Sequence, residues 1–126
     1  MTVAEHAENI SVDHTPVRTR ALIIGSGFSG LGMAIELQRQ GIEFEILEKA
    51  DEVGGTWRDN TYPGCACDIP SHMYSFSFEP NHEWSGYYSK QAELHRYFED
   101  VADRYDLRRH VRFGTSVETL AWDAST

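Results

Sequence analysis

The stretch "ALIIGSGFSG", residues 21–30, decides the fold. Its apolar run stops at Gly25, and Gly27 and Gly30 follow with the spacing G-x-G-x-x-G. Gly25 permits the tight turn after a strand, Gly27 lets a pyrophosphate approach the backbone, and Gly30 lets a helix pack closely on the sheet. Three glycines alone are a weak signal, because any glycine-rich turn can match this spacing by chance. The flanking sequence must therefore supply the strand and the helix.

The residues after the glycines have the pattern of a helix followed by a second strand. Apolar side chains recur at helical spacing as far as Gln40, and Gly41 ends this helix. Residues 42–47, "IEFEIL", then alternate apolar and acidic residues in the manner of a second strand, with Glu48 at its end. A strand, a helix and a strand within about 28 residues is the length of a crossover unit with parallel strands. The sequence predicts an α/β, Rossmann-like fold.

Glu48 lies 18 residues after Gly30, close to where a dinucleotide-binding loop places an acidic residue. Its carboxylate can accept both ribose hydroxyls of an adenosine and repels a 2′-phosphate, so we expect FAD or NAD here rather than NADP. In the alternative reading, Glu48 is a solvated strand-end residue and the glycine turn is purely structural. The cofactor contacts expected in this region are Gly25, Ser26, Gly27, Phe28, Ser29, Gly30, Glu48 and Lys49.

Residues 50–89 are rich in Gly, Pro, Asn, Asp and aromatic residues. A segment of this length without a helix is usually functional. Its one extended signal is an alternation of aromatic residues with serines, which predicts a half-buried strand of Tyr74, Phe76 and Phe78.

The last third of the chain returns to regular patterns. Ser89 is a plausible N-cap for a helix whose apolar residues follow the i, i+3, i+4, i+7 spacing as far as Tyr105. Residues 111–117 are expected to form a third strand, and residues 118–122 the start of another.

Composition limits the class of protein. Eleven basic and twenty acidic residues give a formal charge of −9, which repels nucleic acid and anionic membrane surfaces. The longest apolar run, residues 21–24, is far short of the roughly 20 residues of a membrane-spanning helix. Residues 1–19 have no apolar period and no signal-peptide pattern, so we expect a disordered tail before a folded domain of residues 20–126 in a cytoplasmic protein.

Residues 48–57, "EKADEVGGTW", extend the pattern into a resemblance. A second glycine pair soon after the acidic residue looks like the signature of two-dinucleotide-binding flavoproteins, in which it lies along the FAD diphosphate and ribityl chain. The segments "GGTWRDNTYPGCACDIPSHMYSFSF", "EWSGYYSKQAELHRYFEDVADRYDL" and "VRFGTSVETLAWD" resemble the N-terminal part of class B flavin monooxygenases, the family of Baeyer-Villiger and flavin-containing monooxygenases. The resemblance covers residues 21 to about 123.

The resemblance implies a two-dinucleotide-binding fold, truncated after the third parallel strand and the start of a β-meander. It implies that NADPH reduces FAD, which traps O₂ as a C4a-peroxyflavin and oxygenates a small organic ketone, nitrogen or sulfur centre. It places Asp68 at the active site beside the flavin as the catalytic residue. It also adds cofactor contacts, which are Gly55, Thr56, Trp57, Asp68 and Tyr74.

Several family features are missing from these 126 residues. They are the second glycine fingerprint for NADPH, the returning strand that closes the FAD domain, and the downstream arginine that usually partners the residue corresponding to Asp68. We therefore expect a partial FAD domain with an unpaired sheet edge, an exposed apolar face and no activity of its own. The alternatives are a stand-alone dinucleotide-binding or regulatory module, or an NAD(P)-dependent oxidoreductase fragment, which the aromatic loop after Gly55 disfavours.

Residues 61–72, "TYPGCACDIPSH", raise the alternatives of a metal site and a redox pair. Cys65, Cys67 and His72, with or without Asp68, could bind a metal, but the one-residue cysteine spacing without a second pair is unlike a zinc site. A redox pair would be C-x-x-C at a helix start. We therefore expect no metal and two small buried cysteines. Asp68 could instead cap the turn at Ile69 and Pro70.

For the neighbouring aromatic residues the alternative is core packing. It applies to Trp57 and Tyr62, whose rings could simply fill the interior of the domain.

Overall fold

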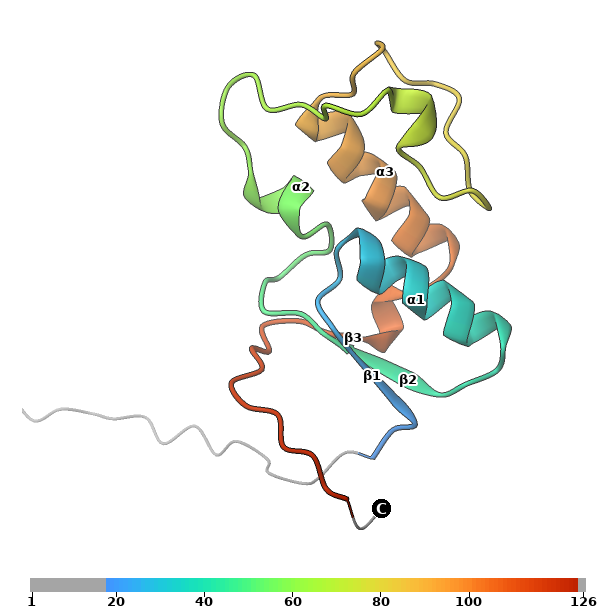
Figure 1. Ribbon diagram of the computed structural model, residues 1–126, viewed down its shortest axis with the longest axis vertical. Coiled ribbons are helices and arrows are strands. Elements are labelled where there is room, and N and C mark those ends of the chain that lie inside the picture. Colours follow the sequence, from blue (N-terminus) through green and yellow to red (C-terminus); the bar gives the residue numbers. More distant parts are fainter. Residues whose placement is uncertain (1–17, 125–126) are drawn as a thin grey trace, which may run out of the picture.

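The computed structural model describes residues 18–124 as an α/β fold (Figure 1). The expected disordered tail, residues 1–19, lies outside the described residues except for its last two. In chain order the elements are β1 Ala21–Ile24, α1 Phe28–Arg39, β2 Phe44–Leu47, α2 Thr56–Asp59, the 3₁₀ turn Ser71–Met73, α3 Gln91–Arg104, the 3₁₀ turn Arg108–His110 and β3 Val111–Arg112.

The three described strands form one parallel sheet in the order β1-β2-β3. Ala21 pairs with Phe44, and Ile46 pairs with Val111. Helix α1 makes the crossover between β1 and β2, and Gly41 (φ +66°) ends the turn after it. The predicted strand-helix-strand unit and the Rossmann-like fold are therefore confirmed.

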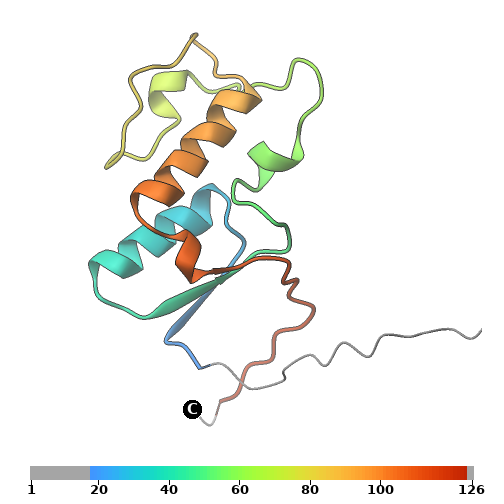
Figure 2. The same ribbon diagram turned by 180° about the vertical axis from the view of Figure 1, so that it is seen from behind.

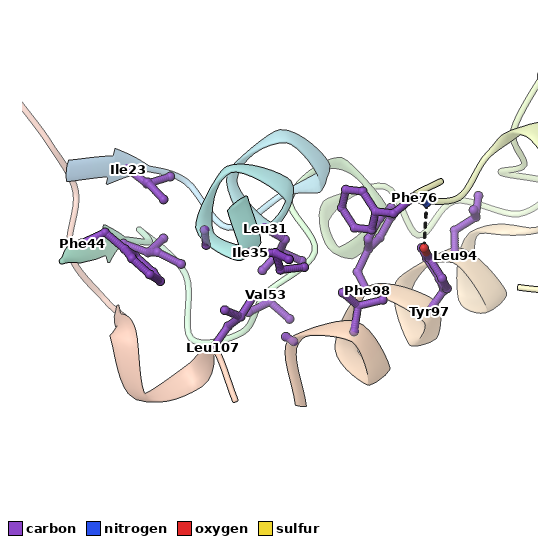
Figure 3. Packing of buried hydrophobic residues seen from close by; sticks show 14 of the residues in the cluster. Ile23, Leu31, Ile35, Phe44, Val53, Phe76, Leu94, Tyr97, Phe98 and Leu107 are labelled. Atoms are coloured by element: carbon purple, nitrogen blue, oxygen red, sulfur yellow. Dashed lines mark hydrogen bonds between the residues drawn. The ribbon is translucent and has the colours of Figure 1, made fainter. Parts of the chain in front are cut away.

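Helices α1 and α3 lie on the same face of the sheet, as both ribbon views show (Figures 1 and 2). Between helices and sheet lies one hydrophobic core (Figure 3). Its fully buried side chains include Leu31, Ile35, Ile46, Val53, Leu94, Phe98, Val101 and Leu107. On the other face Leu22 and Ile24 remain 46% and 54% exposed, and β1 has a single strand neighbour within the described residues. The expected free sheet edge and exposed apolar face are both present.

Helix α3 is amphipathic as predicted, but it begins two residues after the expected cap. The N-cap is Lys90, whose backbone N–H contacts the carboxylate of Glu93 at 3.4 Å. Ser89 is buried, and its hydroxyl donates to Ser71 Oγ at 2.6 Å. The prediction of Ser89 as the N-cap is wrong because its hydroxyl is used in this contact between two loops.

The strand expected at residues 74–78 is absent, and Phe76 forms only an isolated bridge with Glu79. The Tyr97 hydroxyl accepts the N–H of Phe76 at 2.8 Å and donates to the carbonyl of Glu79 at 2.7 Å. One phenol thus takes the place of a strand partner. The Phe76 ring is buried and stacks on Phe28 at 4.5 Å.

The third strand, expected over residues 111–117, is limited to Val111–Arg112. Gly114 (φ +62°) turns the chain, and its N–H donates to the carbonyl of Ala50 at 2.9 Å. Residues 118–122 form no strand, so that prediction is wrong. Leu120 and Trp122 there are 74% and 90% exposed, and apolar residues without a surface to pack on gain nothing from pairing.

A pair of Leu→Ala substitutions, one buried and one exposed, tests this core. Leu94→Ala should lower the free energy of unfolding by about 2–5 kcal/mol, because Leu94 is completely buried in the hydrophobic core. Leu120→Ala removes the same atoms from an exposed site and should change it by less than about 0.5 kcal/mol. Urea unfolding followed by circular dichroism measures both, and equal losses would contradict this core.

Candidate dinucleotide-binding site

The glycine loop between β1 and α1 has the geometry that its spacing predicts. Gly25 has a φ of +88°, which favours glycine. A Cβ on Gly30 would lie 2.0 Å from the carbonyl oxygen of Gly25, so only glycine allows the helix to approach this closely. Among residues 18–124 no side chain caps the N-terminus of α1. Its first amides and the positive end of its dipole are available to an anion.

The second glycine pair, Gly54 and Gly55, packs directly against this loop. Both residues have positive φ, +119° and +54°. The Gly54 N–H donates to the carbonyl of Ser26 at 3.0 Å, and a Cβ on Gly55 would lie 3.0 Å from the Cα of Gly27. The two glycine segments therefore meet backbone to backbone beside the uncapped end of α1.

Two cavities flank this meeting point, and both border on Gly25, Gly27, Gly55 and Thr56. The first, about 380 Å³, is also lined by Glu48, Lys49 and Arg58 and is called the acidic-side cavity. The second, about 350 Å³, is lined by Phe28, Ser29, Gly30, Trp57 and Tyr74 and is called the aromatic-side cavity. The cofactor contacts predicted from the sequence lie around these two cavities, apart from buried Ser26 and from Asp68.

Glu48 is buried, with only 3% of its side chain exposed, so the alternative of a solvated strand-end residue is wrong. Its Oε2 accepts the N–H (2.8 Å) and the hydroxyl (2.7 Å) of Ser26. Its Oε1 accepts the N–H of Ala50 (3.0 Å) and Nη1 of Arg58 (3.2 Å). Four donors fill the acceptor capacity of a carboxylate. In this arrangement a ribose hydroxyl can bind Glu48 only in exchange for one of these partners, and the expected contact of Glu48 with a ribose stays a prediction.

These contacts determine the ionisation of Glu48. Burial alone would raise its pKa, but hydrogen bonds from Ala50 and Ser26 and the positive charge of Arg58 outweigh burial and lower the pKa to about 2. Glu48 is therefore an anion at neutral pH.

Arg58 is the site residue that sequence reasoning missed. Its guanidinium also donates to the backbone carbonyl of Glu52 and, through Nε, to Asp59 at 2.9 Å. The only available signal was its position three residues after Gly55, because an arginine in a loop does not reveal which carboxylate it will reach.

Trp57 and Tyr74 form one wall of the aromatic-side cavity. The indole Nε1 of Trp57 donates to the Tyr74 hydroxyl at 3.1 Å, and the two rings meet edge to face at 5.8 Å. Tyr74 in turn stacks on Phe28, the first residue of α1, at 5.4 Å. Both residues of the wall are half-buried, so Trp57 packs against the core and also lines the cavity.

Asp68 does not line either cavity. Its side chain is exposed and forms no hydrogen bond or ion pair within residues 18–124. The alternative role as a turn cap is wrong, because the N–H of Ile69 donates to Cys67 Sγ at 3.4 Å instead. The role of Asp68 in catalysis stays a prediction.

Cys65 and Cys67 are free and buried, at 8% and 6% exposure, as expected for small packing residues. In the described part of the chain no group of three or more His, Cys, Asp or Glu side chains is placed to hold a metal ion. Tyr62 is 62% exposed, so the core-packing alternative fails for this residue. Among residues 18–124 no helix is both long and apolar enough to cross a membrane.

The family model for an NAD(P)-binding Rossmann-like domain matches residues 23–90. The chain belongs to this family.

The curated relatives of the chain are monooxygenases. A Baeyer-Villiger monooxygenase of Streptomyces coelicolor is 58% identical over 105 residues, or 82% of this chain and 20% of that protein. A Baeyer-Villiger monooxygenase of Pseudomonas aeruginosa is 49% identical over 118 residues, or 90% of this chain and 22% of that protein. The chain thus spans about a fifth of the length of the relatives it matches.

Solved structures give the same result. The crystal structure of OTEMO in complex with FAD and NADP has a TM-score of 0.80 at 33% identity, over 88% of this chain and 22% of that one. The open crystal structure of cyclohexanone monooxygenase has a TM-score of 0.71 at 43% identity, over 76% of this chain and 20% of that one. The resemblance to Baeyer-Villiger monooxygenases and to the N-terminal part of their fold is confirmed.

The low pKa of Glu48 predicts how stability depends on pH. Because the pKa falls from 4.5 to about 2 on folding, Glu48 stabilises the fold fully above about pH 4.5 and loses this effect as the pH approaches 2. Urea unfolding of Glu48→Gln should show a loss on the order of 3 kcal/mol at neutral pH that shrinks through this window.

The control is Glu118→Gln, which removes an exposed carboxylate and should follow the parent chain at every pH. Parallel pH profiles for the Glu48→Gln variant and the parent chain would contradict the hydrogen-bond network around Glu48.

Proposed function

We propose that this chain is the FAD-binding part of an NADPH-dependent flavoprotein monooxygenase. The reaction is a Baeyer-Villiger oxidation of a ketone or the oxygenation of a nitrogen or sulfur centre in a small organic substrate, with O₂ as co-substrate. The observation that carries the proposal is the backbone contact between Gly27 and Gly55 beside the uncapped N-terminus of α1. The names of the relatives, which include FAD-binding monooxygenases, support the same cofactor.

The residues around the two cavities fit FAD. The glycine segments and the amides at the start of α1 suit a diphosphate, since no Cβ blocks its approach and the helix dipole favours an anion. The acidic-side cavity offers Lys49 and Arg58 as polar partners for the adenosine half, and Glu48 in exchange for one of its present partners. The aromatic-side cavity, with Phe28, Trp57 and Tyr74, offers flat apolar surface toward the flavin half.

When bound, FAD supplies the redox chemistry and the activation of O₂. The protein's part is to bind and orient the cofactor and to exclude water. The Trp57–Tyr74 pair closes one side of the cavity with aromatic surface, which keeps water away. Asp68 is our candidate catalytic residue: its carboxylate has no partner within residues 18–124 and is free to hold a basic group beside the cofactor.

The remaining parts of the proposal concern the whole protein. We place the NADPH site and the rest of the FAD domain outside these 126 residues, since the relatives are about five times as long. The net charge of −9 disfavours nucleic acid and membrane surfaces as partners. Use of NADPH and two unpaired cysteines fit a cytoplasmic location.

Titration of the purified chain with FAD tests the proposed cofactor. Gly27→Ala should weaken FAD binding by at least about tenfold, because its Cβ would occupy the approach to the diphosphate. The free chain should tolerate this change, since Gly27 has a φ of −80° and the added Cβ would meet nothing closer than 3.6 Å.

Gly86→Ala is the matched control, because its Cβ would meet only the carbonyl of Tyr88 at 3.8 Å, and it should bind FAD like the parent chain. Binding of ADP or NAD without any retention of flavin would instead support a nucleotide-binding module and overturn the proposed function.

A second measurement addresses activity. The 126-residue chain, loaded with FAD, should not turn over NADPH, because the family's NADPH fingerprint is missing from its sequence. Loss of NADPH absorbance in the presence of O₂ and a ketone is the assay. Sustained turnover by the chain alone would show that it is not a partial domain.

A further inference from the structure

Gln91, the first residue of α3, joins two segments that are far apart in the sequence. Its backbone N–H donates to the carbonyl of Cys65 at 3.0 Å. Its side-chain amide donates to the backbone carbonyl of Trp57. Trp57 forms part of the cavity wall, and Cys65 begins the short segment that contains Asp68. Gln91 therefore contacts the wall through its side chain and the Asp68 segment through its backbone N–H.

The connection to the Asp68 segment is a small ladder separate from the main sheet. Ala66 and Lys90 form an antiparallel bridge, and the N–H of Cys67 donates to the carbonyl of Ser89 at 2.9 Å. Asp68 follows directly after Cys67, the last residue of its segment in this ladder. Its backbone position is therefore set by the residues immediately before α3.

The connection to Trp57 continues into the wall of the aromatic-side cavity. Trp57 donates to the Tyr74 hydroxyl, and Tyr74 stacks on Phe28. One turn further along α3, Nε2 of His95 donates to the carbonyl of Val53 at 3.1 Å. The start of α3 thus holds the second glycine segment at both of its ends.

We propose that Gln91 is a positioning residue that fixes the Trp57–Tyr74 wall relative to the Asp68 segment. This inference rests on the proposed function, because the Trp57–Tyr74 wall lines the cavity that we propose for the flavin half of FAD. The side-chain amide of Gln91 donates to the carbonyl of Trp57, and this carbonyl has no other partner within residues 18–124.

Two variants separate this role from a contribution to the helix. Gln91→Met keeps the length of the side chain and removes the donor. Gln91→Glu at neutral pH also removes the donor, because an ionised carboxylate only accepts. It adds a negative charge at a helix N-terminus, which stabilises the helix. A role in the helix therefore predicts that Gln91→Glu is harmless, whereas a positioning role predicts that it resembles Gln91→Met.

The first readout needs no cofactor. Hydrogen exchange of the Trp57 indole N–H, followed by ¹⁵N NMR and assigned with Trp57→Phe, should accelerate by about three- to tenfold in both variants, because loss of the bond from Gln91 to the Trp57 carbonyl weakens the indole's own bond to Tyr74. Gln40→Met is the control, since Gln40 is exposed and its hydrogen bonds in the described part of the chain go only to Glu36 and to backbone carbonyls of its own helix. Unchanged exchange in both Gln91 variants overturns the proposal.

The second readout is FAD affinity as a function of pH. Both variants should bind FAD about three- to tenfold more weakly than the parent chain at neutral pH. At about pH 4 protonation gives Gln91→Glu a donor again, so its affinity relative to the parent should recover while that of Gln91→Met does not. A helix effect predicts no recovery, and that result would also overturn the proposal.

The two readouts keep the inference distinct from the proposed function. Failure of the parent chain to bind FAD would count against the proposed function, while the exchange of the Trp57 indole would still decide the role of Gln91. FAD binding that is unaffected by both Gln91 variants would leave the proposed function standing and overturn this inference.

Discussion

The buried carboxylate of Glu48 is the interaction on which the site depends. A carboxylate with 3% exposure is tolerated only when its charge is compensated and its acceptors are filled. Glu48 meets this requirement with Ser26 from the first glycine loop, Ala50 from its own strand end and Arg58 from α2. The same bonds bring both glycine segments to the end of β2. Satisfying one charge therefore also assembles the place where a diphosphate can bind.

Close packing imposes the second constraint, because Gly30 and Gly54 lie where a Cβ would clash. Gly30 lies against Gly25, and a Cβ on Gly54 would lie 2.6 Å from His95 of α3. Helix α3 lies on the same face of the sheet as α1 and contributes Leu94 and Phe98 to the core. The helix that builds the core is thus also the support for the second glycine segment, which explains why core and site share one element.

The sequence was sufficient wherever structure follows from local rules. Periodicity predicted β1, α1, β2 and α3, and the glycine spacing predicted the turn between β1 and α1. The sequence-based prediction failed where a side chain distant in the sequence forms the decisive hydrogen bonds. The aromatic alternation at residues 74–78 reads as a strand, but Tyr97 takes the hydrogen bonds that a neighbouring strand would form. The position of Ser89 predicts an N-cap, but its hydroxyl donates to Ser71 instead. Neither partner can be inferred from spacing, since each pair is joined only by the tertiary fold.

The same distinction separates the two carboxylates that the sequence marks for function. Glu48 has all of its acceptor sites filled and a pKa of about 2, so at neutral pH it neither exchanges a proton nor takes a new partner without losing an old one. Asp68 is exposed and unpartnered within residues 18–124, at the end of a ladder that Gln91 holds against Trp57. A residue that must hold a basic group needs free acceptors and a fixed backbone. Of the two, Asp68 alone combines them, which is why we propose Asp68, and not Glu48, as the catalytic residue.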